Sequence, residues 1–180
     1  NYPAALEHYR KARELFTEVP NNFESAKALS GVAMIYREQR RENEALAALE
    51  QALKEFTSLG DQVEISNTLN SIGAIHYGQR NYTAAAEAFR KSGEANNTVE
   101  SLVRLADSLY MQGDYPQAFA YYKQSLDRVH EIGAVIASFN GAANSAYYQG
   151  NYEEALKYYE RSATIQKTLP DKIGLANAFK

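Results

Sequence analysis

The stretch GDYPQAFAYYKQSL (residues 113–126) recurs in related form as GNYEEALKYYERSA (residues 150–163), 37 residues further along the chain. Three more segments follow the same pattern less closely: NYPAALEHYRKA from residue 1, ENEALAALEQAL from residue 42 and NYTAAAEAFRKS from residue 81. Self-similarity at a period of roughly 20 to 50 residues is typical of a repeat array rather than of a single-copy catalytic domain. The sequence therefore predicts a chain built from copies of one structural unit.

Each copy contains an alanine followed four residues later by a large apolar side chain. The pairs are Ala5/Tyr9, Ala45/Leu49, Ala85/Phe89, Ala118/Tyr122 and Ala155/Tyr159. A second small residue follows one turn later: Ala12, Ala52, Ser92, Ser125 and Ser162. Residues four apart lie on the same face of a helix. Each copy is therefore expected to form a helix that packs closely against another helix.

A second periodic segment lies between these helices, with apolar residues three, four and seven positions apart. Its members are Leu29, Val32, Ala33 and Tyr36; Leu69, Ile72, Gly73 and His76; Leu102, Leu105, Ala106 and Leu109; and Phe139, Ala142, Ala143 and Ala146. This spacing predicts an amphipathic helix. Cap residues with Glu or Gln three positions later mark helix starts at Asp61, Asn97, Asp114 and Asn151. The repeating unit is thus expected to be a pair of helices.

This two-helix unit resembles the tetratricopeptide repeat, which has an aromatic residue, Leu-Gly and Tyr in its first helix and Ala, an aromatic residue and Pro in its second. The match extends over the whole chain and is strongest in the second helices, through the five alanine pairs. In the first helices only Gly73 keeps the glycine, Leu, Phe or Ala replaces the tryptophan, and the terminal proline is absent. The resemblance implies an all-α fold, a right-handed α-solenoid of antiparallel helix pairs.

The equivalent alanines are 33 to 40 residues apart, whereas the usual tetratricopeptide period is about 34, which indicates the long-repeat variety. A HEAT-type helical array is the structural alternative. We expect a single repeat domain over residues 1–180. Its units are 1–20 (second helix only), 21–59, 60–96, 97–132, 133–169 and 170–180 (first helix only). Because neither end shows the polar capping element usual in repeat arrays, we interpret the sequence as part of a longer chain.

Composition and motifs narrow the class of function. The 180 residues carry a formal net charge of −3, which gives no electrostatic reason to expect nucleic acid as a partner. There is no cysteine and no apolar run of about 18 residues, so we expect no thiolate chemistry and no membrane insertion. His8, His76 and His130 lack metal-binding spacing, and no phosphate-binding loop or nucleophile elbow is present. We expect no enzyme activity, no metal, no cofactor and a cytoplasmic location.

The resemblance also implies that the first helices line a concave face. On the first of these helices the non-packing stripe runs through Lys27, Ser30, Met34 and Arg37. On the later ones we expect partner-binding residues at Asn67, Asn70, Tyr77, Arg104, Tyr110, Asn140, Asn144, Tyr147, Tyr148 and Asn177. Asn side chains can hold an extended peptide backbone, because each offers a hydrogen-bond donor and an acceptor. Tyr is enriched in interface hot spots, and Arg pairs with acidic groups.

The alternative is that these Asn side chains are solvated surface and that the Tyr side chains cover the neighbouring helix. Five other tyrosines occupy repeated packing positions, and we expect them in the core: Tyr82, Tyr115, Tyr122, Tyr152 and Tyr159. The leading hypothesis for function is a protein-interaction scaffold that binds a peptide or helix of a partner. The alternative is a regulatory or sensor domain of a larger signalling protein or transcription regulator. A third hypothesis is self-association through the uncapped ends.

Overall fold

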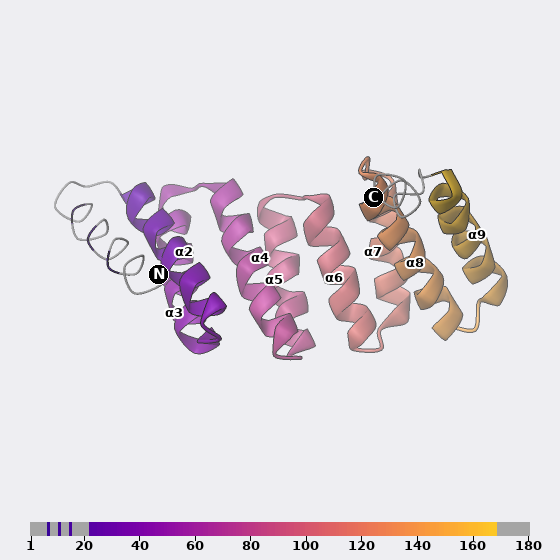
Figure 1. Cartoon of the computed structure of the whole chain (residues 1–180), viewed down its shortest axis with the longest axis horizontal. Helices are drawn as coiled ribbons and strands as arrows, with labels where there is room; N and C mark the ends of the chain where they lie inside the picture. The colour runs from indigo at the N-terminus through magenta and orange to yellow at the C-terminus, as the bar shows by residue number, and fades with distance from the viewer. Residues whose placement is uncertain (1–6, 8–10, 12–14, 16–21, 169–180) are drawn as a thin grey trace, which may run out of the picture. The chain divides into compact units, whose positions relative to one another are not determined.

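The computed structural model describes residues 7, 11, 15 and 22–168. All regular secondary structure in residues 22–168 is helical, so the expected all-α class is confirmed (Figure 1). The helices are α2 (Asn22–Glu38), α3 (Glu42–Leu59), α4 (Gln62–Gly78), α5 (Tyr82–Ala95), α6 (Val99–Met111), α7 (Tyr115–Leu126), α8 (Ile132–Tyr148) and α9 (Tyr152–Thr168). No helix in this part of the chain is both long enough and apolar enough to cross a membrane.

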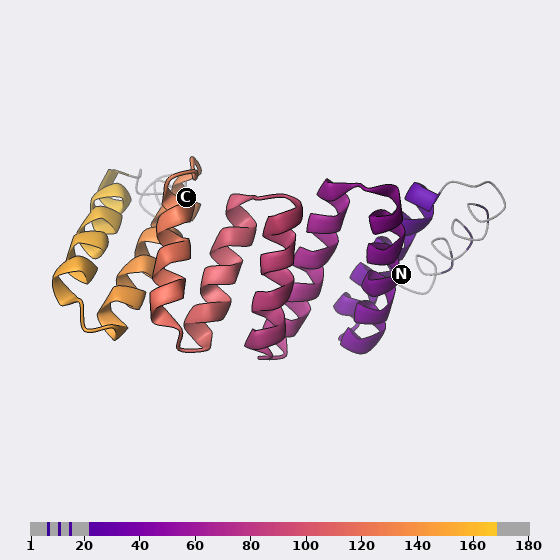
Figure 2. The same ribbon diagram turned by 180° about the vertical axis from the view of Figure 1, so that it is seen from behind.

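The helices form two compact units, Asn1–Ser101 and Leu102–Lys180. In the first unit α3 packs against both α2 and α4, and α4 packs against α5. In the second unit α8 packs against both α7 and α9. Short turns reverse the chain between successive helices, as Figures 1 and 2 show from opposite sides. Neighbouring helices within a unit are therefore antiparallel, and α2 and α4 run in the same direction.

The alanines of the repeated pairs lie where the helices meet. Ala45, Ala85 and Ala118 are fully buried, and Ala155 is 2% exposed. Their large partners Leu49, Phe89 and Tyr122 are also buried. The small residues one turn later are buried in all four described copies: Ala52, Ser92, Ser125 and Ser162. The predicted packing pattern is confirmed for the copies at Ala45, Ala85 and Ala118, whereas in the copy at Ala155 the large partner Tyr159 is exposed. The copy at Ala5, Tyr9 and Ala12 lies outside the described residues.

Serine replaces alanine at several of these contacts because its hydroxyl finds a partner there. The Oγ atoms of Ser66 on α4 and Ser92 on α5 are 2.8 Å apart. The hydroxyl of Ser125 on α7 donates to the Oγ atom of Ser138 on α8, also at 2.8 Å. All four serines are buried, and a buried hydroxyl that is hydrogen-bonded escapes the desolvation penalty of an unpaired one. These positions therefore require a small side chain, and a polar one is accepted when its hydroxyl is hydrogen-bonded.

The expectation that the five packing tyrosines are all core residues is only partly met. Tyr122 is buried and Tyr82 and Tyr115 are half-buried. Tyr152 and Tyr159 are exposed, at 63% and 38% of their surface, so the expectation is wrong for these two. Both lie on α9. The repeated position thus decides which face of the helix a tyrosine occupies but not how much of it is covered.

Four turns between paired helices share one backbone geometry. Each contains a residue with positive φ: Arg40 (61°), Arg80 (60°), Gly113 (84°) and Gly150 (80°). The amide of the next residue donates to the carbonyl five positions earlier, at 2.9 Å in all four turns. This is the hydrogen bond of a Schellman motif, which requires a left-handed residue at the helix end. Glycine adopts that conformation without strain, whereas arginine does not.

The predicted helix starts are confirmed at Asp61 and Asp114. The Asp61 carboxylate accepts from the amides of Val63 and Glu64, and that of Asp114 accepts from the amide of Gln117. The start predicted at Asn97 is wrong by one residue. The Thr98 hydroxyl caps α6 by accepting from the amide of Ser101 at 3.1 Å. A threonine hydroxyl caps a helix as an Asn side chain does, and Thr98 directly precedes the first helical residue.

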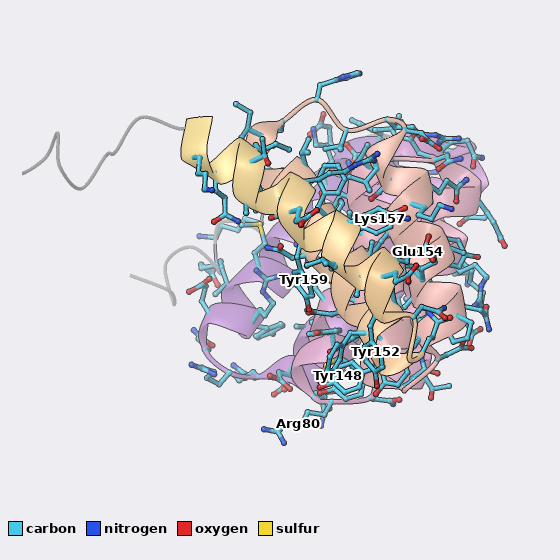
Figure 3. All side chains as sticks on the ribbon, turned by 90° about the vertical axis from the view of Figure 1, so that its right-hand side faces the viewer. Arg80, Tyr148, Tyr152, Glu154, Lys157 and Tyr159 are labelled. Atoms are coloured by element: carbon cyan, nitrogen blue, oxygen red, sulfur yellow. The ribbon has the colours of Figure 1, made fainter. Side chains whose placement is uncertain are left out.

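Replacing Arg80 with glycine should stabilise the protein. A left-handed conformation costs a non-glycine residue about 1–2 kcal/mol, which exceeds the cost of about 0.5–1 kcal/mol for the extra flexibility of glycine. The Arg80 side chain points away from the ribbon, so little packing is lost (Figure 3). We expect the free energy of unfolding in urea to rise by about 0.5–1 kcal/mol.

Arg90→Gly, at an exposed position inside α5, is the matched control for Arg80→Gly. There the same change should lower the free energy of unfolding by about 1 kcal/mol, because glycine is a poor helix former. Destabilisation by both changes would contradict the claim that Arg80 is strained.

Replacing Gly73 with alanine should destabilise the contact between α4 and α5. A Cβ atom at Gly73 would lie 2.7 Å from Cε1 of the Phe89 ring, and overpacking of this kind typically costs about 1–3 kcal/mol. Gly78→Ala on the same helix meets no atom within 4 Å and should raise stability by about 0.4–1 kcal/mol. Adding Phe89→Leu to Gly73→Ala should recover part of the loss; no recovery would mean that the ring is not the obstacle.

Candidate partner-binding surface

The expected partner-binding residues, here called the first-helix stripe, lie on three helices in the described part of the chain. Asn67, Asn70 and Tyr77 are on α4, Arg104 and Tyr110 on α6, and Asn140, Asn144, Tyr147 and Tyr148 on α8. Asn177 lies outside the described residues. Asn67, Asn70 and Tyr77 belong to the first unit, and the other described members of the stripe belong to the second.

In the first unit the stripe borders a hollow of about 110 Å³ between α2 and α4. Asn67 lines the hollow and is exposed. Asn70 is half-buried, and its Oδ1 atom has no hydrogen-bond partner among the described residues. Tyr77 packs edge-to-face against Tyr82 across the turn, with ring centroids 5.3 Å apart. Asn67 is therefore the member of the α4 stripe that a ligand can reach most directly.

The floor of the hollow is apolar and its walls offer few free hydrogen-bonding groups. Ala33, Leu49 and Ile75 line it and are buried. Three hydroxyl groups in the walls donate to carbonyls four residues earlier in their own helices, at 3.2 Å (Ser30), 2.7 Å (Thr68) and 3.0 Å (Ser71). Their hydrogens are therefore already used. The interior of the hollow suits an apolar group better than a polar one.

The rim of the hollow carries the flexible and charged groups. Met34 is 66% exposed, and Arg37, Glu64 and Asn67 complete the rim. Arg37 is in the last turn of α2 and Glu64 in the first turn of α4. Since these two helices run in the same direction, the two charges lie toward opposite ends of the hollow. Neither makes an ion pair with another described residue.

In the second unit one member of the stripe is occupied by an internal hydrogen bond. The Tyr159 hydroxyl on α9 donates to Oδ1 of Asn144 on α8. The preceding repeat has the same arrangement, in which the Tyr122 hydroxyl on α7 donates to Oδ1 of Asp107 on α6 at 2.5 Å. Asn144 therefore holds two helices together and is a poorer candidate for ligand binding than Asn140. This role of Asn144 was not expected from the sequence.

Five tyrosines form a connected group, here called the tyrosine cluster: Tyr110, Tyr115, Tyr147, Tyr148 and Tyr152. The rings of Tyr115 and Tyr148 are stacked, with centroids 4.9 Å apart. Tyr110 contacts both of them at 5.4 and 5.9 Å, and Tyr147 contacts Tyr148 and Tyr152 at 5.6 and 5.3 Å. The cluster joins the end of α8 to the start of α9, where Figure 3 labels Tyr148 and Tyr152.

The tyrosine cluster has a half-buried part and an exposed part. Burial, followed by the neighbouring Tyr148, raises the pKa of Tyr110 to about 12, so its hydroxyl stays protonated at neutral pH. Tyr147 and Tyr148 are 51% and 57% exposed. The part of the cluster that a partner can contact therefore lies at Tyr147, Tyr148 and Tyr152.

Sequence reasoning missed the cluster as a unit, although a signal for it was present. Tyr77/Tyr82, Tyr110/Tyr115 and Tyr147/Tyr152 are each five residues apart across a turn, and each pair makes an edge-to-face contact. Aromatic pairs prefer this geometry. The stacking of Tyr148 on Tyr115 joins residues of different repeats, and no spacing within one repeat reveals it.

The buried carboxylate of Asp107 should make stability depend on pH. Burial raises its pKa above the usual 3.8, although the Tyr122 hydroxyl and the Arg104 charge lower it. The folded state therefore holds this proton more tightly than the unfolded state does. The contribution of Asp107 to the free energy of unfolding falls as pH rises from about 3.8 through the raised pKa, and is constant above it.

Asp107→Asn should remove that dependence, because Asn144 shows that an amide oxygen can accept the same tyrosine hydroxyl. Relative to the unmodified protein, the variant should gain stability between about pH 3 and pH 7 in urea unfolding. The double change Asp107→Ala, Tyr122→Phe copies the Ala74/Phe89 pair of the earlier repeat and should behave in the same way. A stability difference that does not vary with pH would show that Asp107 has an ordinary pKa.

Several solved structures have a fold similar to that of this chain. BtubC from P. vanneervenii matches 92% of this chain and 73% of its own, with a TM-score of 0.82 and 17% identity. The apo form of RapI matches 95% of this chain with a TM-score of 0.85 and 20% identity. This chain spans 50% of the length of RapI. At these identities the likeness shows the fold, and it confirms the expected solenoid of helix pairs.

A third similar structure is YrrB, a tetratricopeptide-repeat protein described as having an unusual peptide-binding site. It matches 99% of this chain and 84% of its own, with a TM-score of 0.72 and 20% identity. A comparison with curated protein sequences found no match.

The family model described as Tetratricopeptide repeat matches the sequence in four overlapping segments. They are residues 1–57, 24–95, 64–131 and 97–168. Together they extend over most of the chain and favour this family over the HEAT-type alternative. The buried alanines, the close approach of α4 to Phe89 at Gly73 and the Schellman turns are the structural counterparts of that match. The chain belongs to the tetratricopeptide-repeat family.

Proposed function

We propose that this chain is a protein-interaction scaffold that binds an extended peptide segment of a partner along the concave face formed by its first helices. The observation that carries the proposal is the hollow between α2 and α4, bordered by the exposed Asn67. A hollow between neighbouring first helices can receive a side chain while Asn67 bonds to the peptide backbone. Asn side chains suit that task because they both donate and accept.

The second unit has candidate contact residues of its own. Asn140 is half-buried on α8, and its side chain makes no hydrogen bond among the described residues. Tyr147 and Tyr148 are more than half exposed, and Tyr adds apolar contact area at a low entropic cost. These residues follow α8 toward its last turn, as an extended ligand would.

Family membership and the solved structures agree with a peptide ligand. Tetratricopeptide-repeat proteins bind protein or peptide partners, and YrrB is described as having a peptide-binding site. A formal net charge of −3 does not favour a polyanion such as nucleic acid. The proposal therefore assigns binding to this chain and no catalytic step.

Selection from a phage-displayed library of random dodecapeptides tests the proposal. The unmodified chain should enrich a related set of peptides, and Asn67→Ala combined with Asn140→Ala should lose most of that enrichment. Neither side chain makes a hydrogen bond among the described residues, whereas that of Asn144 accepts one from Tyr159. A change in fold is therefore not expected, and circular dichroism should show equal helicity.

The matched control is Asn43→Ala combined with Gln124→Ala, which removes amides from exposed positions of the second helices α3 and α7. This variant should enrich the same peptides as the unmodified chain. If the control loses the peptides and the first-helix variant keeps them, the ligand binds the other face and the proposal is wrong.

A further inference from the structure

We propose that the hollow between α2 and α4 is a specificity pocket for one branched aliphatic side chain, flanked in the peptide by a basic residue on the Glu64 side and an acidic residue on the Arg37 side. This inference rests on the proposed function and adds the chemistry of the ligand. It concerns the first unit only, so all the residues that carry it lie in one compact body.

The lining of the hollow selects an apolar group. Its floor consists of Ala33, Leu49 and Ile75, which belong to or border the hydrophobic core. The three wall hydroxyls donate to their own helices, so a polar side chain placed there would exchange water for few new hydrogen bonds. Burying an unpaired polar group is costly, whereas burying an aliphatic one is favourable.

The size of the hollow favours a branched aliphatic side chain over an aromatic one. Its volume is about 110 Å³. Benzene fits a protein cavity of about 150 Å³, which is larger. A Val, Leu or Ile side chain therefore fits without rearrangement, while a Phe or Trp ring would require movement of the rim.

Met34 makes the pocket adjustable at its mouth. Its side chain is 66% exposed although it lines the hollow, so it has room to fold over an entering group. Methionine is unbranched and adapts to irregular apolar surfaces. A bound aliphatic side chain would thus be covered by Met34 and would in turn bury apolar surface that Met34 now exposes to water.

The charges at the rim set the order of the flanking residues. Glu64 lies at the α4 start and Arg37 at the α2 end, and neither is neutralised by an ion pair within the described residues. A peptide with an acidic residue beside Glu64 and a basic residue beside Arg37 would be repelled at both ends. A peptide with the opposite placement would be attracted at both. Arg37 can also hold a carboxylate through two parallel hydrogen bonds. The occupant is therefore a peptide with a basic, an aliphatic and an acidic residue in sequence along the groove.

The library selection is then repeated with two altered pockets. Ser71→Leu fills the hollow from the α4 wall, and Ser58→Leu on α3 is its matched control, since both hydroxyls bond to their own helix backbone and Ser58 does not line the hollow. Arg37→Glu makes both ends of the rim acidic. Met34→Ala widens the mouth and serves as a second variant should Ser71→Leu lose helicity.

We expect peptides enriched by the unmodified chain to share an aliphatic residue between a basic and an acidic one. Ser71→Leu should abolish this pattern and Ser58→Leu should keep it. Arg37→Glu should replace the acidic residue of the pattern with a basic one, and Met34→Ala should admit Phe. A synthetic peptide of the most enriched sequence should bind at least about tenfold more weakly when its aliphatic residue becomes Ala.

Two outcomes overturn the inference and are distinguishable. If the unmodified chain enriches peptides that Asn67→Ala with Asn140→Ala loses, but without the aliphatic and charge pattern or without any effect of Ser71→Leu, the pocket is not selective and the proposed function stands. If the unmodified chain enriches no peptides at all, both the inference and the proposed function are wrong.

Discussion

The close approach of helices at small residues is the constraint on which the rest of the structure depends. Ala45, Ala85 and Ala118 are fully buried, and serine appears at such contacts where a second serine pairs with its hydroxyl, as Ser66 does with Ser92. Dense packing leaves no space for an extra methyl group. Because the helix axes are held this close, adjacent first helices are also brought near each other, and the hollow between α2 and α4 is a consequence of that spacing.

The turns show a case in which tertiary context prevails over local preference. Arg40 and Arg80 adopt the left-handed conformation that Gly113 and Gly150 adopt without strain, and all four turns keep the same 2.9 Å hydrogen bond. The strain at an arginine is about 1–2 kcal/mol, which the packing of two helices outweighs. The sequence does not indicate the turns at Arg40 and Arg80, since no propensity rule places arginine at positive φ.

Periodicity predicted the helices and their packing faces, because burial of one face is what the pattern records. It did not predict the exposure of Tyr152 and Tyr159, since repeat spacing assumes that every copy has the same neighbours. Tyr122 contacts Asp107 on one side and lies against Gly141 of the next helix on the other. For Tyr159 the structure shows a hydrogen bond to Asn144 of α8. The sequence did not predict the hollow between α2 and α4 either, because its volume depends on the distance between these two helices.

A polar side chain on a first helix is either free or hydrogen-bonded within the repeat, depending on the residue 15 positions later on the second helix. Asp107 and Asn144 each accept a hydroxyl from the tyrosine at that distance, whereas the equivalent pairs Ala74/Phe89 and Met34/Leu49 have no hydroxyl to offer. A polar residue at this position of a repeat is therefore bound internally when its partner is tyrosine. Where the partner is apolar, as Leu49 is, no such internal hydrogen bond forms with it. In the first unit Met34 is accordingly 66% exposed and lines the hollow beside Asn67.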